Sequence, residues 1–284
     1  MGTGTDGHLE VMSTPSDTSP EGTGFPRPLA VVTGASSGIG RALAQEFVDH
    51  GFDVAIAAED NAIEAVAIEL GRGESDVIAI QVDLSTPNGV EELYANVRQL
   101  GRTPDAVALN VGVGAGGSFE EIPLADDLRV IDLNVRSTVH LAKHMVQDMV
   151  AAGRGRILIT SSIAAVSPGP YHATYAASKA FVHSFAEAIG EELKETGVTV
   201  TSLMPGPTDT GFFARAGMLD TPLGSSNDKD DPRDVARDGY EALMSGRSSV
   251  VAGSAKNRLQ AELGTHLPDA LATPLMTRKT KPHH

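Results

Sequence analysis

The chain has 284 residues, of which 41% are hydrophobic and 21% are charged, the composition of a globular protein with one large or two small domains. Its formal net charge of −15 disfavours nucleic acid as a partner, because such a field repels phosphate backbones. The absence of cysteine excludes disulfides, zinc–thiolate sites and cysteine nucleophiles. No apolar run approaches the ~18 residues of a membrane span, so we expect no membrane partner.

Residues 1–27 are rich in glycine, serine, threonine and proline. They have neither the basic start nor the apolar centre of a secretory signal. This composition predicts a disordered leader and, with it, a cytoplasmic protein.

From residue 28 onward, short apolar runs alternate with segments of helical periodicity. The runs are almost continuously apolar, which is typical of parallel strands buried on both faces. Strands are expected at 29–34, 53–58, 77–83, 105–111, 156–162, 198–206 and 249–253. Helices are expected at 39–50, 61–71, 88–100, 125–152 and 172–195. This order predicts an α/β fold, a doubly wound (Rossmann) sheet of seven parallel strands forming one domain over 28–284.

Three local signals refine the boundaries of these elements. Asp231 is a candidate N-cap with Pro232 at the first helical position, and Gly153 is a candidate end for the long helix. The connection 207–230 is longer than usual and holds a few apolar residues, which predicts a lid over a binding site.

The stretch "TGASSGIG" (33–40) follows the first expected strand and opens the first expected helix. A turn of this kind brings backbone N–H groups and a helix N-terminus towards a pyrophosphate, and its glycines let the phosphates approach. The alternative is a tight turn that needs glycine only for its backbone angles.

Tyr175 and Lys179, in "YAASK", are four residues apart and therefore share one face of a helix. One interpretation is an ordinary surface pair. The other is a phenol whose pKa a neighbouring ammonium group lowers, so that it exchanges protons near neutral pH.

Taken in order, "TGASSGIG", "LNVGVG" (109–114), "DLNV" (132–135), Ser162, "YAASK" and "PGPTDT" (205–210) resemble the motifs of the short-chain dehydrogenase/reductase superfamily. The resemblance covers nearly all of 28–256. It implies a nicotinamide cofactor and hydride transfer to or from a small alcohol or carbonyl compound. The apolar residues of the lid would favour an apolar substrate.

The resemblance implies a catalytic set of Asn134, Ser162, Tyr175 and Lys179. Tyr175 would be the general acid or base and Lys179 would also hold the nicotinamide ribose. Ser162 would bond the substrate oxygen, and Asn134 would fix a water of a proton relay. Taken singly, Ser162 could bond only its own turn and Asn134 could be an ordinary helix residue.

The implied cofactor residues extend along the whole chain. They are Gly34, Ser36, Ser37, Gly38, Ile39, Gly40, Glu59, Asp83, Leu84, Asn110, Gly112, Tyr175, Lys179, Pro205, Gly206, Thr208 and Thr210.

Glu59 lies 19 residues after Gly40, where an acid accepts hydrogen bonds from ribose hydroxyls and repels a 2′-phosphate. Ser37 stands where NADP-preferring relatives often carry a basic residue. We therefore favour NAD over NADP, although Glu59 could merely cap the next helix. A departure from the family pattern is Leu109, where many relatives have asparagine, and this puts a hydrogen bond that braces the strands in doubt.

Candidate substrate residues are Ser162, Pro168, His172, Phe212 and Phe213, although the two phenylalanines could equally be the lid's own packing. His140 and His144 are also four apart on one helix and could bind a metal in principle. No third ligand is evident from the sequence, so no metal site is predicted there.

Two alternatives to the oxidoreductase remain open. One is a non-catalytic dinucleotide sensor or scaffold, and the other is an isomerase or lyase that retains its cofactor. The resemblance also implies a homodimer or homotetramer packed through the helix 125–152 and the helix of Tyr175. The C-terminal segment 257–284 is expected either to cover a neighbouring subunit or to fray.

Overall fold

The computed structural model describes residues 1, 27–266 and 268–282, and its centre is one sheet of seven parallel strands. The strands lie in the order β3-β2-β1-β4-β5-β6-β7, so the predicted Rossmann-type sheet is confirmed. Their bounds are β1 (Leu29–Thr33), β2 (Asp53–Ala58), β3 (Val77–Gln81), β4 (Ala106–Leu109), β5 (Gly155–Thr160), β6 (Val198–Pro205) and β7 (Ser249–Ala252).

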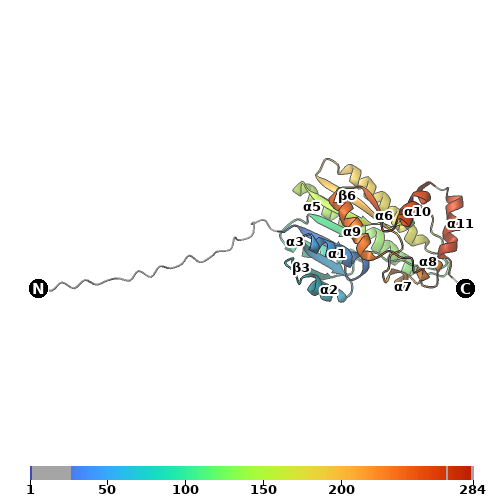
Figure 1. Ribbon diagram of the computed structural model, residues 1–284, viewed down its shortest axis with the longest axis horizontal. Helices are drawn as coiled ribbons and strands as arrows, with labels where there is room; N and C mark the ends of the chain where they lie inside the picture. Colours follow the sequence, from blue (N-terminus) through green and yellow to red (C-terminus); the bar gives the residue numbers. More distant parts are fainter. Residues whose placement is uncertain (2–26, 267, 283–284) are drawn as a thin grey trace.

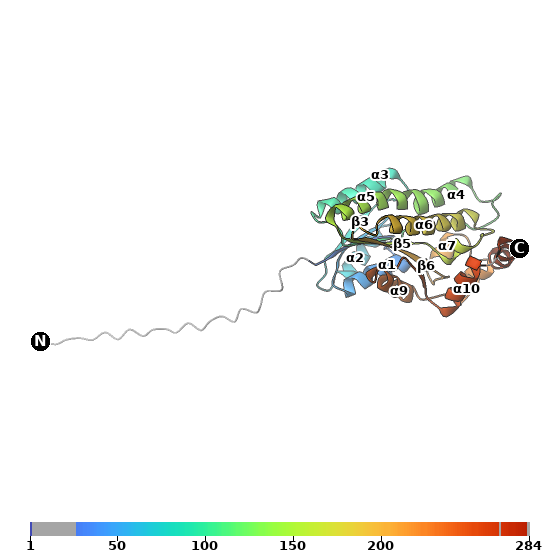
Figure 2. The ribbon, with the colours of Figure 1, turned by 90° about the horizontal axis from the view of Figure 1, so that it is seen from above.

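Helices cover both faces of the sheet, as Figures 1 and 2 show. One layer consists of α1 (Gly38–Asp49), α2 (Ala62–Leu70) and α9 (Pro232–Met244). The other consists of α3 (Pro87–Gln99), α4 (Leu124–Ile131), α5 (Ser137–Ala152) and α6 (Ala173–Glu192). Beyond these layers lie α7 (Phe212–Arg215), α8 (Pro222–Ser225), α10 (Ala255–His266) and α11 (Asp269–Thr280).

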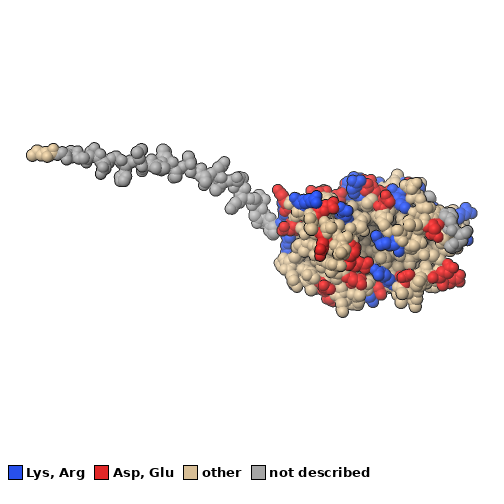
Figure 3. Space-filling model, turned by 90° about the horizontal axis from the view of Figure 1, so that it is seen from below, with Lys and Arg blue, Asp and Glu red and all other residues tan. Residues whose placement is uncertain are grey.

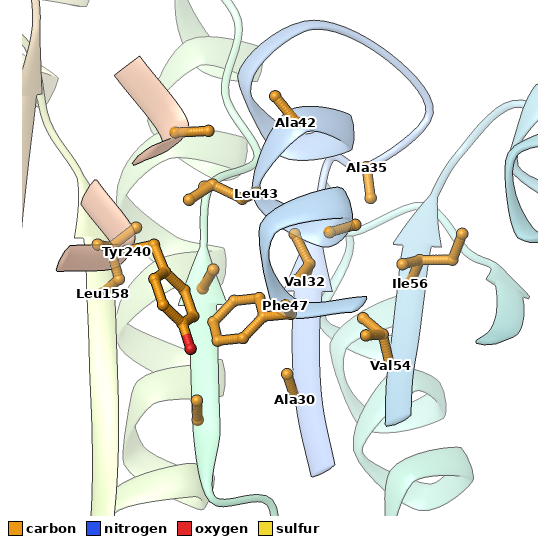
Figure 4. Close-up of a cluster of buried hydrophobic side chains, with 14 of the residues drawn as sticks. Ala30, Val32, Ala35, Ala42, Leu43, Phe47, Val54, Ile56, Leu158 and Tyr240 are labelled. Carbon is orange, nitrogen blue, oxygen red and sulfur yellow. The ribbon is translucent and has the colours of Figure 1, made fainter. Parts of the chain in front are cut away.

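The core under α1 and α9 is built around Phe47, which has no exposed surface. Its ring meets Phe52 and Tyr240 edge-on, with centroids 5.2 and 5.4 Å away, and Figure 4 shows it next to Tyr240 on one face of the sheet. Burying this aromatic cluster stabilises the packing of the C-terminal half of α1 against α9 on this face of the sheet.

Two of the predicted boundary signals are confirmed. Gly153 ends α5 in the left-handed region with φ of +68°. Asp231 caps α9, since its carboxylate accepts a hydrogen bond from the Arg233 amide at 2.8 Å.

The helical segment expected at 125–152 is found over that range, but it is not one continuous α-helix. Between α4 and α5 the chain makes a π-helical turn, η1 (Asp132–Arg136), which contains Asn134. Apolar periodicity does not reveal a single π-helical turn, because it shifts the register by only one residue.

The predicted leader 1–27 lies, apart from its ends, outside the described residues. Within the part of the chain that the structure describes, no helix combines the length and the apolar character needed to cross a membrane. On the face drawn in Figure 3, acidic side chains are interspersed with basic ones. The cytoplasmic location stays a prediction.

Candidate active site

A cleft of about 860 Å³ opens at the carboxyl ends of the strands. It lies where β1 and β4 are neighbours, because the connections from these two strands leave towards opposite faces of the sheet. Every predicted cofactor residue except Gly40 lines this cleft. Of the other candidates, Ser162, His172, Phe212 and Phe213 line it, whereas Asn134 and the exposed Pro168 do not.

The glycine-rich turn adopts the geometry that a phosphate cradle requires. α1 begins at Gly38, whose φ is +56°, and its N-cap residue Ser37 makes no side-chain capping bond. The first amides of the helix therefore keep their donors for another acceptor. A Cβ at Gly40 would collide with the Gly34 carbonyl, so this residue closes the turn rather than lining the cleft. These features fit a dinucleotide pyrophosphate.

At the end of β2, Glu59 forms a two-pronged ion pair with Arg129 of α4. Both carboxylate oxygens accept from the same guanidinium nitrogen, at 3.0 and 2.8 Å. The alternative role for Glu59 as a helix cap is wrong, because Asp60 accepts the bond from the Ala62 amide instead. Arg129 was not anticipated from the sequence, and only folding brings it to this end of the cleft.

Asn110 takes over the bracing that the missing asparagine at Leu109 put in doubt. Its amide group donates to the Thr33 carbonyl at 3.3 Å, and its side-chain oxygen accepts from the Thr160 hydroxyl at 3.0 Å. It therefore ties β1 to β5 across β4. Leu109 is buried in β4 and contributes only apolar packing.

Tyr175 lies on α6 at the inner end of the cleft, with Ser162 beside it. Burial raises the pKa of the Tyr175 phenol to about 12, and a hydrogen bond with the Ser162 side chain offsets part of that rise. The Ser162 oxygen also accepts a bond from the Ala164 amide at 3.1 Å, so it does bond its own turn as well. The prediction of a lowered phenol pKa is therefore wrong for the chain alone, because desolvation outweighs the other effects.

Lys179 is 5% exposed, which excludes the interpretation of a surface pair. Its ammonium donates to the Thr160 carbonyl at 2.8 Å and lies 5.9 Å from the centre of the Tyr175 ring. Burial lowers the pKa of Lys179 to about 8. The Ser161 hydroxyl donates to the Lys179 carbonyl at 2.8 Å, so the last residue of β5 and the residue after it hold the ammonium and the main chain of Lys179.

Asn134 is almost fully buried in the π-helical turn, and its amide group is fully used. The side-chain oxygen accepts from the Val113 amide, and the nitrogen donates to the Val113 carbonyl and to Ser178, all at 2.9 Å. Asn134 thus fastens the loop after β4 to the helix of Tyr175. Single π-helical turns of this kind are frequent at functional sites.

His172 directly precedes α6 and lines the cleft with only 3% of its surface exposed. Its Nδ1 is buried without a hydrogen-bond partner among the described residues. Burial lowers the pKa of His172 to about 4, so the imidazole is neutral at physiological pH.

The predicted lid contains α7 and α8, and its two phenylalanines have different environments. The ring of Phe212 lies 5.1 Å from that of Tyr175, at the cleft. Phe213 packs with Ala216 and Met218 inside the lid. Both residues also line the cleft and their rings lie 5.5 Å apart, so each takes part in the packing of the lid and in the wall of the cleft.

The glycine-rich segment after β4 is where the lid rests. A Cβ at Gly114 would lie 2.7 Å from the Phe212 ring, and one at Gly116 would overlap Met218. The Gly116 amide donates to the Ala216 carbonyl at 2.8 Å. These glycines are needed because the lid lies directly on their backbone.

The C-terminal helix α11 lies over the cleft of its own chain. Met276, Lys279 and Pro282 contribute to the lining, and the Thr280 hydroxyl donates to the Pro170 carbonyl at 2.7 Å. Figure 1 shows α11 next to α8. The low apolar periodicity of this segment gave no signal for its position.

A family model described as short chain dehydrogenase matches residues 28–218. An uncharacterized oxidoreductase of Staphylococcus saprophyticus is 30% identical over 223 residues, which cover 76% of this chain and 91% of that protein.

Two solved structures extend the comparison to ligand complexes. A short-chain dehydrogenase from Sphingobium yanoikuyae in complex with NADPH has a TM-score of 0.73 at 25% identity, covering 88% of this chain and 95% of its own. The 3-ketoacyl-(acyl-carrier-protein) reductase from Brucella melitensis complexed with NADH has a TM-score of 0.69 at 25% identity, covering 79% and 96%.

Proposed function

Since the chain belongs to the short-chain dehydrogenase family, we propose that it is an oxidoreductase that transfers a hydride between a nicotinamide cofactor and an alcohol or carbonyl substrate. The observation that carries this proposal is the meeting of Ser162, Tyr175 and Lys179 at the inner end of the cleft that begins at the phosphate loop. A dinucleotide bound from that loop would have room to extend to the tyrosine.

The nicotinamide would supply or accept the hydride at the substrate carbon. In the reductive direction, Tyr175 gives its hydroxyl proton to the carbonyl oxygen, so that carbonyl, hydride and proton become an alcohol. The Ser162 hydroxyl donates a hydrogen bond to the same oxygen as negative charge develops there. A pKa of about 12 keeps the phenol protonated and ready to donate. The Lys179 ammonium stabilises the phenolate that remains.

The test is Tyr175→Phe, once a panel of alcohols and ketones has given a substrate. Removal of a general acid costs roughly 10²–10⁴-fold in kcat. A variant with full turnover would refute the assignment. Cofactor binding without any turnover across the panel would favour a sensor, and turnover without net change in NADH would favour an isomerase or lyase.

We further propose that NAD is preferred to NADP, because the ribose end of the cleft is acidic. Glu59, Asp60 and Asp83 line it, against one cation, Arg129, that is paired with Glu59. A 2′-phosphate would have to displace this pair. The two complexes named above contain NADPH and NADH, so the family uses both and the chain's own residues decide.

The Glu59 pair predicts how the preference can be reversed. Glu59→Gln removes the acid and frees Arg129 for a 2′-phosphate, and it should change the ratio of the NADH and NADPH dissociation constants by at least about tenfold. Glu64→Gln, an exposed acid on α2, is the charge-matched control and should leave the ratio unchanged. Adding Arg129→Gln to Glu59→Gln should abolish the gain in NADPH affinity. An unchanged ratio in Glu59→Gln would show that the acid does not select the cofactor.

The residues around the substrate end favour an apolar alcohol or ketone. Phe212, Met218 and Met276 line this part of the cleft from the lid and from α11. Phe212→Ala should raise KM for bulky apolar substrates more than for small ones. Equal changes in KM for bulky and small substrates would show that Phe212 does not contact the substrate.

We also propose a homo-oligomer that forms across the outer side of α4 and α6. A second copy of the chain would cover an apolar groove between η1 and α6, lined by Ile131, Val135 and Phe181 among others. Ile131 and Phe181 are 43% and 45% exposed, and Leu128 beside them is 48% exposed, which a self-association surface would explain. Light scattering on the wild type and on Phe181→Asp tests this, and a monomeric wild type would refute it.

A further inference from the structure

Three metal-ligating side chains meet outside the cleft, on the layer formed by α3 and α5. The two histidines one turn apart on α5, His140 and His144, both reach Glu91 of α3. Their Nε2 atoms lie 2.7 and 3.1 Å from the same oxygen of Glu91. This third candidate ligand was not evident from the sequence, because Glu91 is 49 residues from His140 and only the packing of α3 against α5 brings it close.

We propose that Glu91, His140 and His144 form a binding site for a first-row transition metal ion, with Zn²⁺ as the best match. The ligand atoms of the three residues all lie within 4.8 Å of one another. Around a tetrahedral Zn²⁺ with bonds near 2.0–2.2 Å, ligand atoms are roughly 3.3 Å apart. To reach that spacing, the contacts of 2.7 and 3.1 Å would open by about 0.6 and 0.2 Å, and any pair of ligand atoms near the 4.8 Å limit would move closer together.

Surrounding contacts hold the site in this arrangement. The ring of Tyr94, on α3, stacks on the His144 ring with centroids 4.1 Å apart and planes at 8°. The Tyr94 hydroxyl donates to Asp148 at 3.1 Å, and Arg98 bonds the other oxygen of that carboxylate at 3.2 Å. Partners of this kind restrict the rotation of a metal-ligating imidazole and thereby favour binding.

The donor set selects the class of ion. Two imidazole nitrogens and one carboxylate suit Zn²⁺, Co²⁺, Ni²⁺ or Cu²⁺, whereas Mg²⁺ and Ca²⁺ prefer oxygen ligands throughout. Three protein ligands leave one position for water in a tetrahedral site, and Glu91 is 55% exposed on its side chain, so solvent reaches it. None of the three residues lines the cleft. The ion would join α3 to α5, and its role would be structural.

The experiment measures Zn²⁺ binding by equilibrium dialysis of the full-length protein at pH 7.5, with Mg²⁺ as the contrasting ion. The sequence also contains His283 and His284, so a His283→Gln/His284→Gln background is measured in parallel. We expect one Zn²⁺ per chain in that background, no Mg²⁺, and a visible d–d absorption band when Co²⁺ replaces Zn²⁺. Absence of stoichiometric Zn²⁺, or equal binding of Mg²⁺, would overturn the proposal.

Substitutions assign the binding to these residues. In the same background, Glu91→Gln, His140→Gln and His144→Gln should each weaken Zn²⁺ binding at least about tenfold. Glu92→Gln is the matched control: it removes the same charge from the next, exposed position of α3 and should bind as before. Zn²⁺ at a hundred times its dissociation constant should raise Tm by about 5 °C in the control and not in Glu91→Gln. Equal binding by Glu91→Gln and Glu92→Gln would disprove the site.

Discussion

The buried imidazole of His172 predicts a specific loss of stability in mild acid. Burial lowers its pKa from 6.5 to about 4, so below pH 6.5 the unfolded chain binds a proton that the folded chain does not. Stability is therefore complete above pH 6.5 and falls as the pH decreases towards 4. At pH 5.5 the free energy of unfolding is lower by about 1.4 kcal/mol, and over the whole range down to pH 4 and below it falls by about 3 kcal/mol.

The assay is urea unfolding of the wild type and of His172→Gln at pH 7.5, 6.5, 5.5 and 4.5. At pH 7.5 the imidazole is neutral in both states, so the difference between the proteins there gives the packing cost alone. Between pH 6.5 and 4.5 the wild type should lose roughly 2–3 kcal/mol more than the variant. Parallel curves for the two proteins over this range would refute the reasoning, because they would mean that His172 is protonated equally in the folded and unfolded states.

Three further substitutions follow from the packing. Asn134→Ala leaves the Val113 amide and carbonyl without their partner. The free energy of unfolding should therefore fall by about 2–4 kcal/mol, and kcat should fall with it. An unchanged urea midpoint would contradict this prediction. Gly114→Ala puts a methyl group 2.7 Å from the Phe212 ring, so KM should rise and Tm should change little. An unchanged KM would mean that the lid does not contact Gly114 during turnover. Phe47→Ala should destabilise by about 3–5 kcal/mol in urea unfolding, and a loss below 1 kcal/mol would show that the cluster with Tyr240 is not tightly packed.

Local patterns in the sequence were sufficient for the layout of the fold. Continuous apolar runs predicted all seven strands, and the caps at Asp231 and Gly153 were predicted from residue type alone. The phosphate loop and the pairing of Tyr175 with Lys179 depend on spacings of a few residues. Such spacings are fixed by helix and turn geometry before any tertiary contact forms.

The electrostatics of the site required the folded chain. The sequence placed Lys179 beside Tyr175 and suggested a lowered phenol pKa, but the depth of burial determines the sign of that shift. Burial depends on every element that packs around the residue and cannot be obtained from a spacing of four. In the same way, Asn134 makes its hydrogen bonds from the π-helical turn to Val113 and Ser178, which are distant in sequence.

The sequence by itself determined the order of the elements and the parallel sheet, because periodicity is a property of neighbouring residues. The proposed catalytic set followed from the resemblance of its motifs to those of the family. The tertiary structure alone decided which distant residues meet: Arg129 with Glu59, α11 with the cleft, and Glu91 with His140. These contacts join segments tens of residues apart or more. Their free energy comes from packing between whole elements, and no local pattern in the chain records it.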